Sequence, residues 1–216
     1  MSYKYIMFDL DGTVIDSEVG IINSVKYTLE QMKIGMLSDE QLRKFIGPPL
    51  ISAFEEFCGL DDNQATEAVK VYRSRYAEKG LLEFTVYDGI CELIKNLVDI
   101  RKSVALVTSK PIEFSEKIAE HIGITGALTL IEASSLLQKG SSKTELINNA
   151  LTKMNCTDKK EAVMVGDRKF DLQAATEVGI DSIGVTYGFG SLEELDGCNP
   201  THIADNCSQL WEILLD

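Results

Sequence analysis

The sequence predicts an α/β fold: a Rossmann-like, mostly parallel sheet with helices on both faces, plus a small all-helical cap domain. Three observations predict it. Apolar, β-rich runs alternate with helical patterns through most of the chain. A long early interval breaks this alternation and has only helical patterns. Several apolar runs end in carboxylate or hydroxyl side chains. Strand–helix alternation implies right-handed crossovers and parallel pairing, with helices covering the sheet.

The alternating elements follow from hydrophobic periodicity. We expect strands at 4–9, 103–108, 127–131, 161–165 and 181–185. The helices between and after them are expected at 89–99, 112–122, 142–154, 169–178 and 207–214.

The interval from about 16 to 85 reads as helices only. We expect them at 17–33, 39–45, 48–58 and 62–79. Because about 70 residues is far more than a crossover needs, we expect a helical cap domain at 16–85. The catalytic core then comprises 1–15 and 86–216. The alternative is one long crossover packed on the sheet.

Composition limits the class of protein. The chain has 216 residues, 44% of them hydrophobic, which is enough to bury a core of this size. No apolar run reaches the length of a membrane span, and the N-terminus lacks the pattern of a secretory signal. Five cysteines without Cys-x-x-Cys spacing are typical of reduced thiols. We expect a cytoplasmic protein without a membrane partner, a monomer or weak homodimer.

The net charge of −13 disfavours nucleic acid as a partner, because the phosphate backbone requires a basic surface. A small phosphorylated substrate is also an anion. Its site would need local positive charge, from a metal ion and from a few lysines or arginines that converge.

The first candidate segment is Asp9-Leu10-Asp11-Gly12-Thr13, which follows an apolar run. Residues i and i+2 of a strand point to the same side, so Asp9 and Asp11 can address one reacting centre. A carboxylate can be the nucleophile in phosphoryl transfer, and a second carboxyl group can serve as general acid and then base. The alternative is an ordinary strand that ends in an Asp-Gly turn.

The second segment is the run 104–107 followed by Thr108, Ser109, Lys110 and Pro111. Pro111 suits the first position of a helix. Thr108 and the exposed amides beside it are placed to hold phosphate oxygens. The alternative is a plain Thr/Ser helix cap.

The third segment centres on Lys143, in the first turn of an expected helix. The helix dipole disfavours a cation there, so an acidic site or a phosphate would explain this lysine. A solvated surface lysine is the alternative, and Lys110 and Lys139 compete for the same role.

The fourth segment is a buried-type strand at 162–165 followed by Gly166-Asp167, with Asp171 four residues later. If a helix begins near Arg168, both carboxylates fall on one side of its first turn. They are then placed to complete an oxygen-ligand site for Mg²⁺. The alternative is that Asp167 caps the helix and Asp171 favours its first turn; capping and metal binding can both hold.

These segments resemble, in order, the four motifs of the haloacid dehalogenase-like hydrolase superfamily, and the helical insert resembles its small helical cap. The resemblance implies Mg²⁺ as cofactor and an aspartyl-phosphate intermediate. It implies that Asp9 is the nucleophile and that Asp11 protonates the leaving alcohol and then activates water. Thr108, Ser109 and Lys143 would bind the phosphate. The metal ligands would be Asp9, the Asp11 carbonyl and Asp167, with Asp171 in support.

Within the superfamily, Phe45–Leu50 and the stretch Tyr187-Gly188-Phe189-Gly190 look most like the phosphoglycolate phosphatase and 5′-nucleotidase-like branch. We therefore expect a phosphatase that acts on a small phosphorylated metabolite. Two alternatives are a phosphomutase of the β-phosphoglucomutase type and a receiver-like signalling module. In the cap, Arg43, Lys44 and Arg73 are placed to read a second anionic group, and solvated helix faces are the alternative for these residues.

Overall fold

The computed structural model describes residues 3–135 and 141–215. The chain divides into two compact units, one formed by Met1–Ile15 with Val86–Asp216 and the other by Asp16–Thr85. Each unit has its own core, and each is described by itself.

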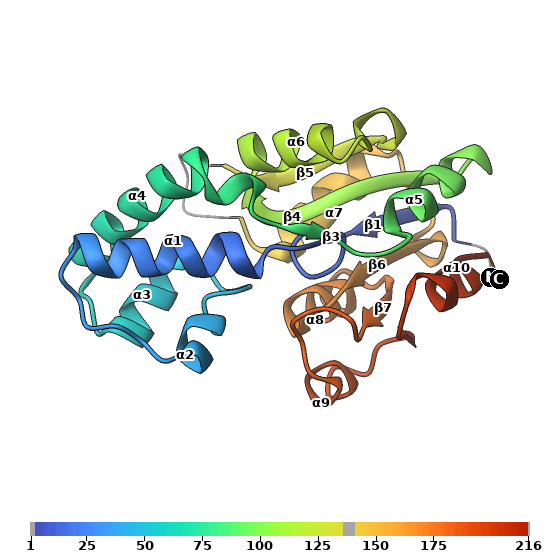
Figure 1. Ribbon diagram of the computed structural model, residues 1–216. Coiled ribbons are helices and arrows are strands. Elements are labelled where there is room, and N and C mark those ends of the chain that lie inside the picture. Colours follow the sequence, from blue (N-terminus) through green and yellow to red (C-terminus); the bar gives the residue numbers. More distant parts are fainter. Residues whose placement is uncertain (1–2, 136–140, 216) are drawn as a thin grey trace. The chain divides into compact units, whose positions relative to one another are not determined.

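The larger unit is built on a six-stranded sheet with the order β5-β4-β1-β6-β7-β8 (Figure 1). Every neighbouring pair of strands is parallel. The strands are β1 (Tyr5–Phe8), β4 (Ser103–Pro111), β5 (Leu130–Ser134), β6 (Ala162–Gly166), β7 (Asp181–Val185) and β8 (His202–Ala204). β1 lies between β4 and β6 and is fully buried, as its run of large apolar residues requires. The predicted parallel α/β fold is therefore confirmed.

Helices cover both faces of this sheet, because each crossover between parallel strands carries one. They are α5 (Ile90–Asp99), α6 (Ile112–His121), α7 (Lys143–Lys153), α8 (Lys169–Val178), α9 (Leu192–Asp196) and α10 (Cys207–Leu215). α7 and α8 form one core cluster with alternate residues of the strands, among them Tyr5, Met7 and Met164. The residues between these, such as Ile6 and Phe8, point to the opposite face, and both are fully buried.

Two predicted elements of this unit need correction. The strand expected at 127–131 runs instead from Leu130 to Ser134, and a 3₁₀ turn, η2 (Thr125–Ala127), precedes it. The predicted strand stops before Glu132, because a charged residue is not expected inside a buried strand. In the structure Glu132 is buried in β5 and forms an ion pair with Lys153 at 2.6 Å. The strand expected at 103–108 continues to Pro111, which is the N-cap residue of α6 and not, as predicted, its first residue.

Several short elements were not predicted. These are β8, α9, a second 3₁₀ turn, η3 (Lys159–Glu161), and a two-stranded sheet of β2 (Ile15–Asp16) and β3 (Thr85–Val86). Each is too short to give a periodic hydrophobic signal.

The smaller unit consists of helices and one 3₁₀ turn. They are α1 (Glu18–Gln31), α2 (Asp39–Arg43), α3 (Leu50–Cys58), α4 (Asp62–Glu78) and η1 (Gly80–Leu82). Its core includes Val25 and Leu29 of α1, Phe54 of α3 and Val69 of α4, all buried. Phe45 packs edge-on against Phe54, with 5.0 Å between ring centroids.

Arg75 of α4 connects the end of this helical unit, at Glu83, with Ser24 of α1. Arg75 Nη1 donates to Glu83 Oε2 at 2.5 Å and to Ser24 Oγ at 3.1 Å, while Nη2 donates to Glu83 Oε1 at 2.9 Å. The Gly20 amide donates to the Glu83 carbonyl at 3.0 Å. A Cβ on Gly20 would overlap the Gly80 carbonyl, so this approach of α1 to η1 requires glycine.

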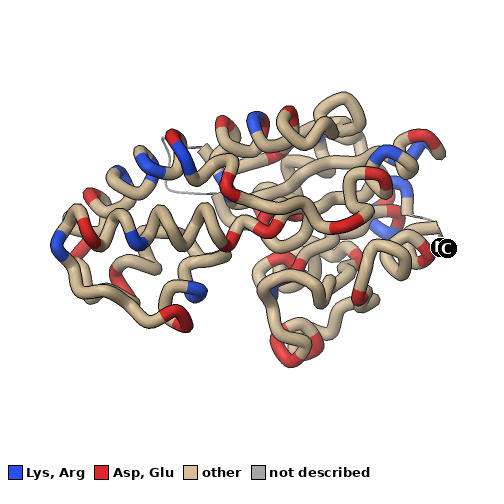
Figure 2. Tube along the Cα trace, in the orientation of Figure 1, with Lys and Arg blue, Asp and Glu red and all other residues tan. Residues whose placement is uncertain are grey.

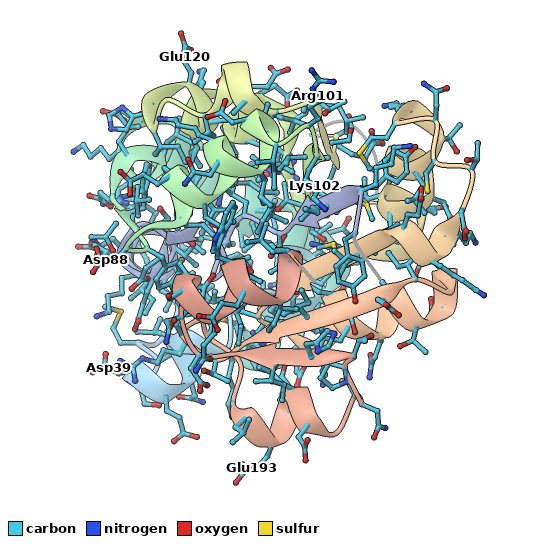
Figure 3. All side chains as sticks on the ribbon, turned by 90° about the vertical axis from the view of Figure 1, so that its right-hand side faces the viewer. Asp39, Asp88, Arg101, Lys102, Glu120 and Glu193 are labelled. Carbon is cyan, nitrogen blue, oxygen red and sulfur yellow. The ribbon has the colours of Figure 1, made fainter. Side chains whose placement is uncertain are left out.

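Charged residues are distributed along both units (Figure 2). Side chains such as Glu120 and Glu193 are exposed and project away from the ribbon (Figure 3). All five cysteines are free thiols. Among the described residues, no helix has the length and apolar character needed to cross a membrane.

Candidate active site

Asp9 is the first residue after the central strand β1. Its amide donates to the Val165 carbonyl at 2.9 Å, so the backbone is fixed where β1 leaves the sheet. The chain then turns at Gly12, which has φ +85°, a conformation that favours glycine. A Cβ at Gly12 would also overlap the carboxylate of Asp167. This turn therefore brings the residues after β1 against those after β6.

Lys143 is the first residue of α7, and its helix start is closed by a capping box between Ser142 and Glu145. Its Nζ lies 2.6 Å from Asp9 Oδ1 and 2.7 Å from Asp171 Oδ1. The Lys143 side chain is only 8% exposed. Burial by itself lowers the pKa of this ammonium group, but the charges of Asp171 and Asp9 outweigh it and raise the pKa above its usual range. The two carboxylates thus explain a cation at a helix start.

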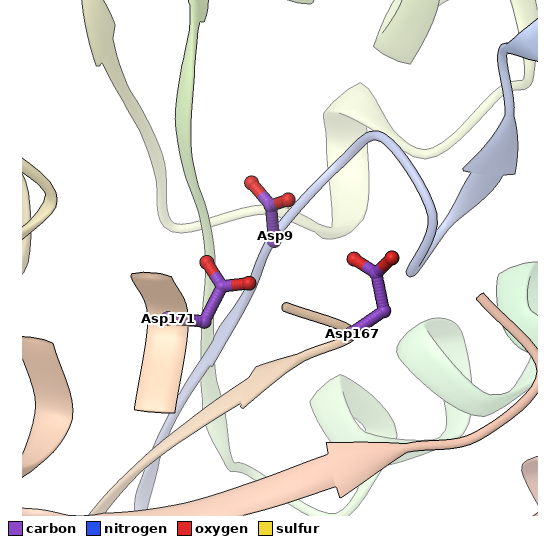
Figure 4. Close-up of side chains that lie close together, drawn as sticks. All are labelled: Asp9, Asp167 and Asp171. Carbon is purple, nitrogen blue, oxygen red and sulfur yellow. The ribbon is translucent and has the colours of Figure 1, made fainter. Parts of the chain in front are cut away.

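Three buried carboxylates converge at this edge of the sheet: Asp9 after β1, Asp167 after β6 and Asp171 in α8 (Figure 4). One oxygen from each lies within 4.8 Å of the others. Burial raises the pKa of Asp9 to about 6, and Asp171 and Asp11 add to this while Lys143 opposes it. Burial likewise raises the pKa of Asp167, with the charges of Asp171 and Asp9 adding to it. Three acidic groups with one lysine among them form a site short of positive charge.

Asp171 also supports the start of α8. Its Oδ2 accepts from the Arg168 amide at 3.2 Å, and Arg168, not Asp167, is the N-cap residue. Capping by Asp167 is therefore wrong as an alternative. Instead, the Asp167 carboxylate accepts from Thr13 Oγ1 at 3.3 Å and from the Phe189 amide at 2.8 Å.

Thr108 lies in β4, two residues beyond the pairing of Leu106 with Phe8, and is buried. It is therefore at the same edge of the sheet as Asp9. Its Oγ1 accepts from the Lys110 amide at 3.2 Å. The next residue, Ser109, is exposed.

Lys110 is part of this site, and the sequence identified it only as a rival of Lys143. Its Nζ lies 2.7 Å from both carboxylate oxygens of Asp11, and its side chain is 6% exposed. The pairing of β4 with β5 shifts register between Thr108 and Pro111. Such bulges redirect side chains at the ends of strands. The two lysines thus pair with different carboxylates: Lys143 forms ion pairs with Asp9 and Asp171, and Lys110 forms one with Asp11.

The other candidates from the sequence belong to the helical unit or to the residues that the structure does not describe. Arg43 and Lys44 are in the helical unit, where Arg43 Nε pairs with Glu18 at 2.7 Å and Lys44 Nζ with Glu40 at 4.0 Å. Their assignment to substrate binding stays a prediction. Lys139 is outside the described residues. Sequence reasoning assigned no site role to Thr13 or Phe189, although both lie within segments that it singled out.

Comparison with known proteins identifies the family. A model of haloacid dehalogenase-like hydrolases matches residues 6–185. The chain belongs to this family. Its alignment with a 5′-nucleotidase of Pseudomonas aeruginosa covers 99% of the chain and 96% of that protein, at 38% identity.

Two further proteins are similar to this chain over nearly their whole length. A phosphoglycolate phosphatase of Vibrio parahaemolyticus is 28% identical, over 98% of this chain and 96% of that protein. The crystal structure of a predicted phosphatase from Clostridium acetobutylicum has a TM-score of 0.93 and 40% identity, covering 100% of this chain and 99% of the other.

Proposed function

We propose that the protein is a Mg²⁺-dependent phosphomonoester hydrolase that acts on a small phosphorylated metabolite. The observation that carries this proposal is the group of three buried carboxylates with Lys143 at the carboxyl edge of the sheet. In open parallel sheets this edge is where ligands bind. The helical unit at 16–85 would act as the cap that selects the substrate.

The donor set fits Mg²⁺. Asp9, Asp167 and Asp171 supply three negative charges and Lys143 one positive charge, so one divalent cation would balance the group. Carboxylate oxygens are the ligands that Mg²⁺ prefers, together with water and substrate phosphate. Asp9, Asp167 and the Asp11 carbonyl would hold the cation, and Asp171 would support them. When bound, the cation offsets the charge of the phosphate and of the nucleophile.

Each residue of the site then has a separate role in the reaction. Asp9 attacks phosphorus and takes the phosphoryl group, while Asp11 in its protonated form donates that proton to the departing alcohol oxygen. The same Asp11, now ionised, takes a proton from water, whose oxygen attacks the phosphorus and releases phosphate from Asp9. Lys143 and Thr108 hold the phosphoryl oxygens, and Lys143 supplies positive charge where negative charge develops. Lys110 orients Asp11 through its two contacts at 2.7 Å.

The names of the relatives narrow the substrate. A 5′-nucleotidase is 38% identical and a phosphoglycolate phosphatase 28% identical, both over nearly the whole chain. We therefore favour nucleoside 5′-monophosphates as substrates, and phosphoglycolate-like esters second. A phosphomutase would use the same core but return the phosphoryl group to the substrate. The family match disfavours a receiver module. The central position of β1 in the sheet does not by itself distinguish a hydrolase from a receiver module.

The test is release of inorganic phosphate from a panel of nucleoside 5′-monophosphates, phosphoglycolate and sugar phosphates, each with Mg²⁺ and with chelator. We expect sustained phosphate release that depends on Mg²⁺. Failure to release phosphate from any ester, or equal rates with chelator, would overturn the proposal. Conversion of one phosphate ester into its isomer without phosphate release would indicate the mutase.

A further inference from the structure

The loop after β7, Tyr187–Gly190, encloses Asp167. The Phe189 amide donates to Asp167 Oδ2 at 2.8 Å. A Cβ on Gly188 would overlap the Asp167 side chain and the Gly12 carbonyl. A Cβ on Gly190 would overlap the Asp167 carbonyl. The loop backbone therefore lies directly against Asp167, and the absence of a Cβ at its two glycines permits this contact.

Tyr187 holds the other side of the same carboxylate through Thr13. The Tyr187 hydroxyl donates to the Thr13 carbonyl at 3.1 Å, and Thr13 Oγ1 donates to Asp167 Oδ1 at 3.3 Å. The Tyr187 ring packs against Tyr87, with 4.8 Å between centroids. Both oxygens of Asp167 thus accept from donors that this loop provides or positions.

We propose that the loop Tyr187–Gly190 is a positioning element that aims the Asp167 carboxylate at the divalent cation; this inference rests on the function proposed above. Oxygens of Asp9 and Asp171 lie within 4.8 Å of an Asp167 oxygen, so the three carboxylates face one point. Hydrogen bonds to both oxygens of the Asp167 carboxylate fix its orientation toward that point. Partners of this kind behind a metal ligand typically contribute about 10- to 100-fold to metal affinity.

If the loop only connected β7 to the rest of the fold, its substitution would not change metal affinity. The test therefore measures metal binding directly. The probe is Mn²⁺ alone. Like Mg²⁺ it prefers oxygen ligands, and electron paramagnetic resonance measures the concentration of free Mn²⁺. The variants are Tyr187→Phe, which removes only the hydroxyl group, and Gly188→Ala, which forces Asp167 to move. Competition by Mg²⁺ is measured on the same samples.

Two matched controls act on β7 (Asp181–Val185), the strand that precedes the loop. Tyr3→Phe removes a tyrosine hydrogen bond of 2.8 Å to Asp181, the first residue of β7. Gly184→Ala places a Cβ in ordinary contact, 3.5 Å from Leu172 and Leu195. Asp167→Asn is the reference for loss of a metal ligand.

We expect the Mn²⁺ dissociation constant to rise about tenfold in Gly188→Ala and about threefold or more in Tyr187→Phe. It should change less than about twofold in the two controls. If Tyr187→Phe and Gly188→Ala bind Mn²⁺ like the controls while Asp167→Asn does not, the inference about the loop fails and the proposed function stands. If Asp167→Asn binds Mn²⁺ normally, the proposed metal site fails, and this inference fails with it. Tyr187→Phe decides the matter alone if Gly188→Ala does not fold.

Discussion

The carboxylates at the edge of the sheet and the Arg75–Glu83 pair of the helical unit are both shielded ionic groups, but their charges are balanced differently. Asp9, Asp167 and Asp171 lie together with one lysine, Lys143, which pairs with Asp9 and Asp171, and burial raises the pKa of Asp9 to about 6. At Glu83, hydrogen bonds from Arg75 lower the carboxyl pKa. The first arrangement opposes its own ionised form, and the cation proposed above would relieve this opposition. The second is complete in itself and stabilises the fold.

We expect the largest effect from Asp9→Asn, which should abolish activity without lowering stability. We expect Asp9→Asn to reduce phosphate release from p-nitrophenyl phosphate by at least about 1000-fold, because it removes the nucleophile. The thermal unfolding midpoint of the metal-free variant should not fall, because one of three crowded charges is gone. The control is Asp99→Asn, an exposed residue of α5, which should change neither quantity. Near-normal turnover in Asp9→Asn would refute the nucleophile assignment.

The Lys110–Asp11 pair is balanced one to one, like Arg75–Glu83, yet it lies beside the crowded carboxylates. We expect Lys110→Met to slow hydrolysis of an alkyl phosphate about 10- to 100-fold, because Asp11 loses its orientation as general acid. Hydrolysis of p-nitrophenyl phosphate should slow less, since its leaving group hardly needs a proton. Lys117→Met, at an exposed position of α6, is the control. Equal losses on both substrates would argue against a role through Asp11.

The completed pair of the helical unit should contribute to stability rather than to chemistry. The Arg75 side chain is 13% exposed and Glu83 31%, so we expect Arg75→Met to lower the free energy of unfolding by about 1–2 kcal/mol. Lys70→Met breaks the exposed Lys70–Glu67 pair, at 68% and 58% exposure, and should cost less than about 0.5 kcal/mol. Chemical denaturation measures both variants. Equal losses in the two variants would show that the Arg75–Glu83 pair stabilises the fold no more than an exposed ion pair does.

The crowded group should also make metal-free stability depend on pH. A folded-state pKa raised above the usual value stabilises the fold below that usual value, and the stabilisation is lost as the pH rises through the folded pKa. For Asp9 this window runs from 3.8 to about 6. Between pH 5 and 7.5 we therefore expect a loss of about 1 kcal/mol from Asp9. Glu83 acts in the opposite sense, but only below its usual pKa of 4.5.

Denaturation in chelator at several pH values tests this. Asp9→Asn should flatten the dependence and Asp99→Asn should not, although both remove one negative charge. An unchanged slope in Asp9→Asn would contradict the assignment.

The smallest effect is expected from the exposed charges of the helical unit. Arg43→Ala with Lys44→Ala should change the preference among phosphate esters by about threefold, as for solvent-exposed ion pairs. Rates with p-nitrophenyl phosphate, which has no second anionic group, should stay the same. The measurement is kcat/KM across the substrate panel, and equal losses on every ester would rule out a role in selection.

The sequence predicted most reliably the site residues that lie directly after a strand. Asp9 and Asp167 each follow a strongly apolar run, so their meeting at one edge of a parallel sheet followed from the pattern alone. The role of Lys110 did not, because it depends on the extension of β4 to Pro111 and on the register shift beside it. β5 was misplaced because a buried Glu132 resembles a loop residue in sequence. The contacts of Phe189 are made by a backbone amide, which any residue except proline carries, and so leave no signal in the residue type.

The amide of Gly20 and the carbonyl of Glu83, joined at 3.0 Å, place the entrance and the exit of the helical unit side by side. Excising that unit therefore leaves two neighbouring ends that a short peptide can join, rather than a gap that must be bridged. The same geometry would let one insert be exchanged for another without altering the spacing of the strands, so the substrate selection proposed for this unit could diverge separately from the chemistry proposed for the larger one.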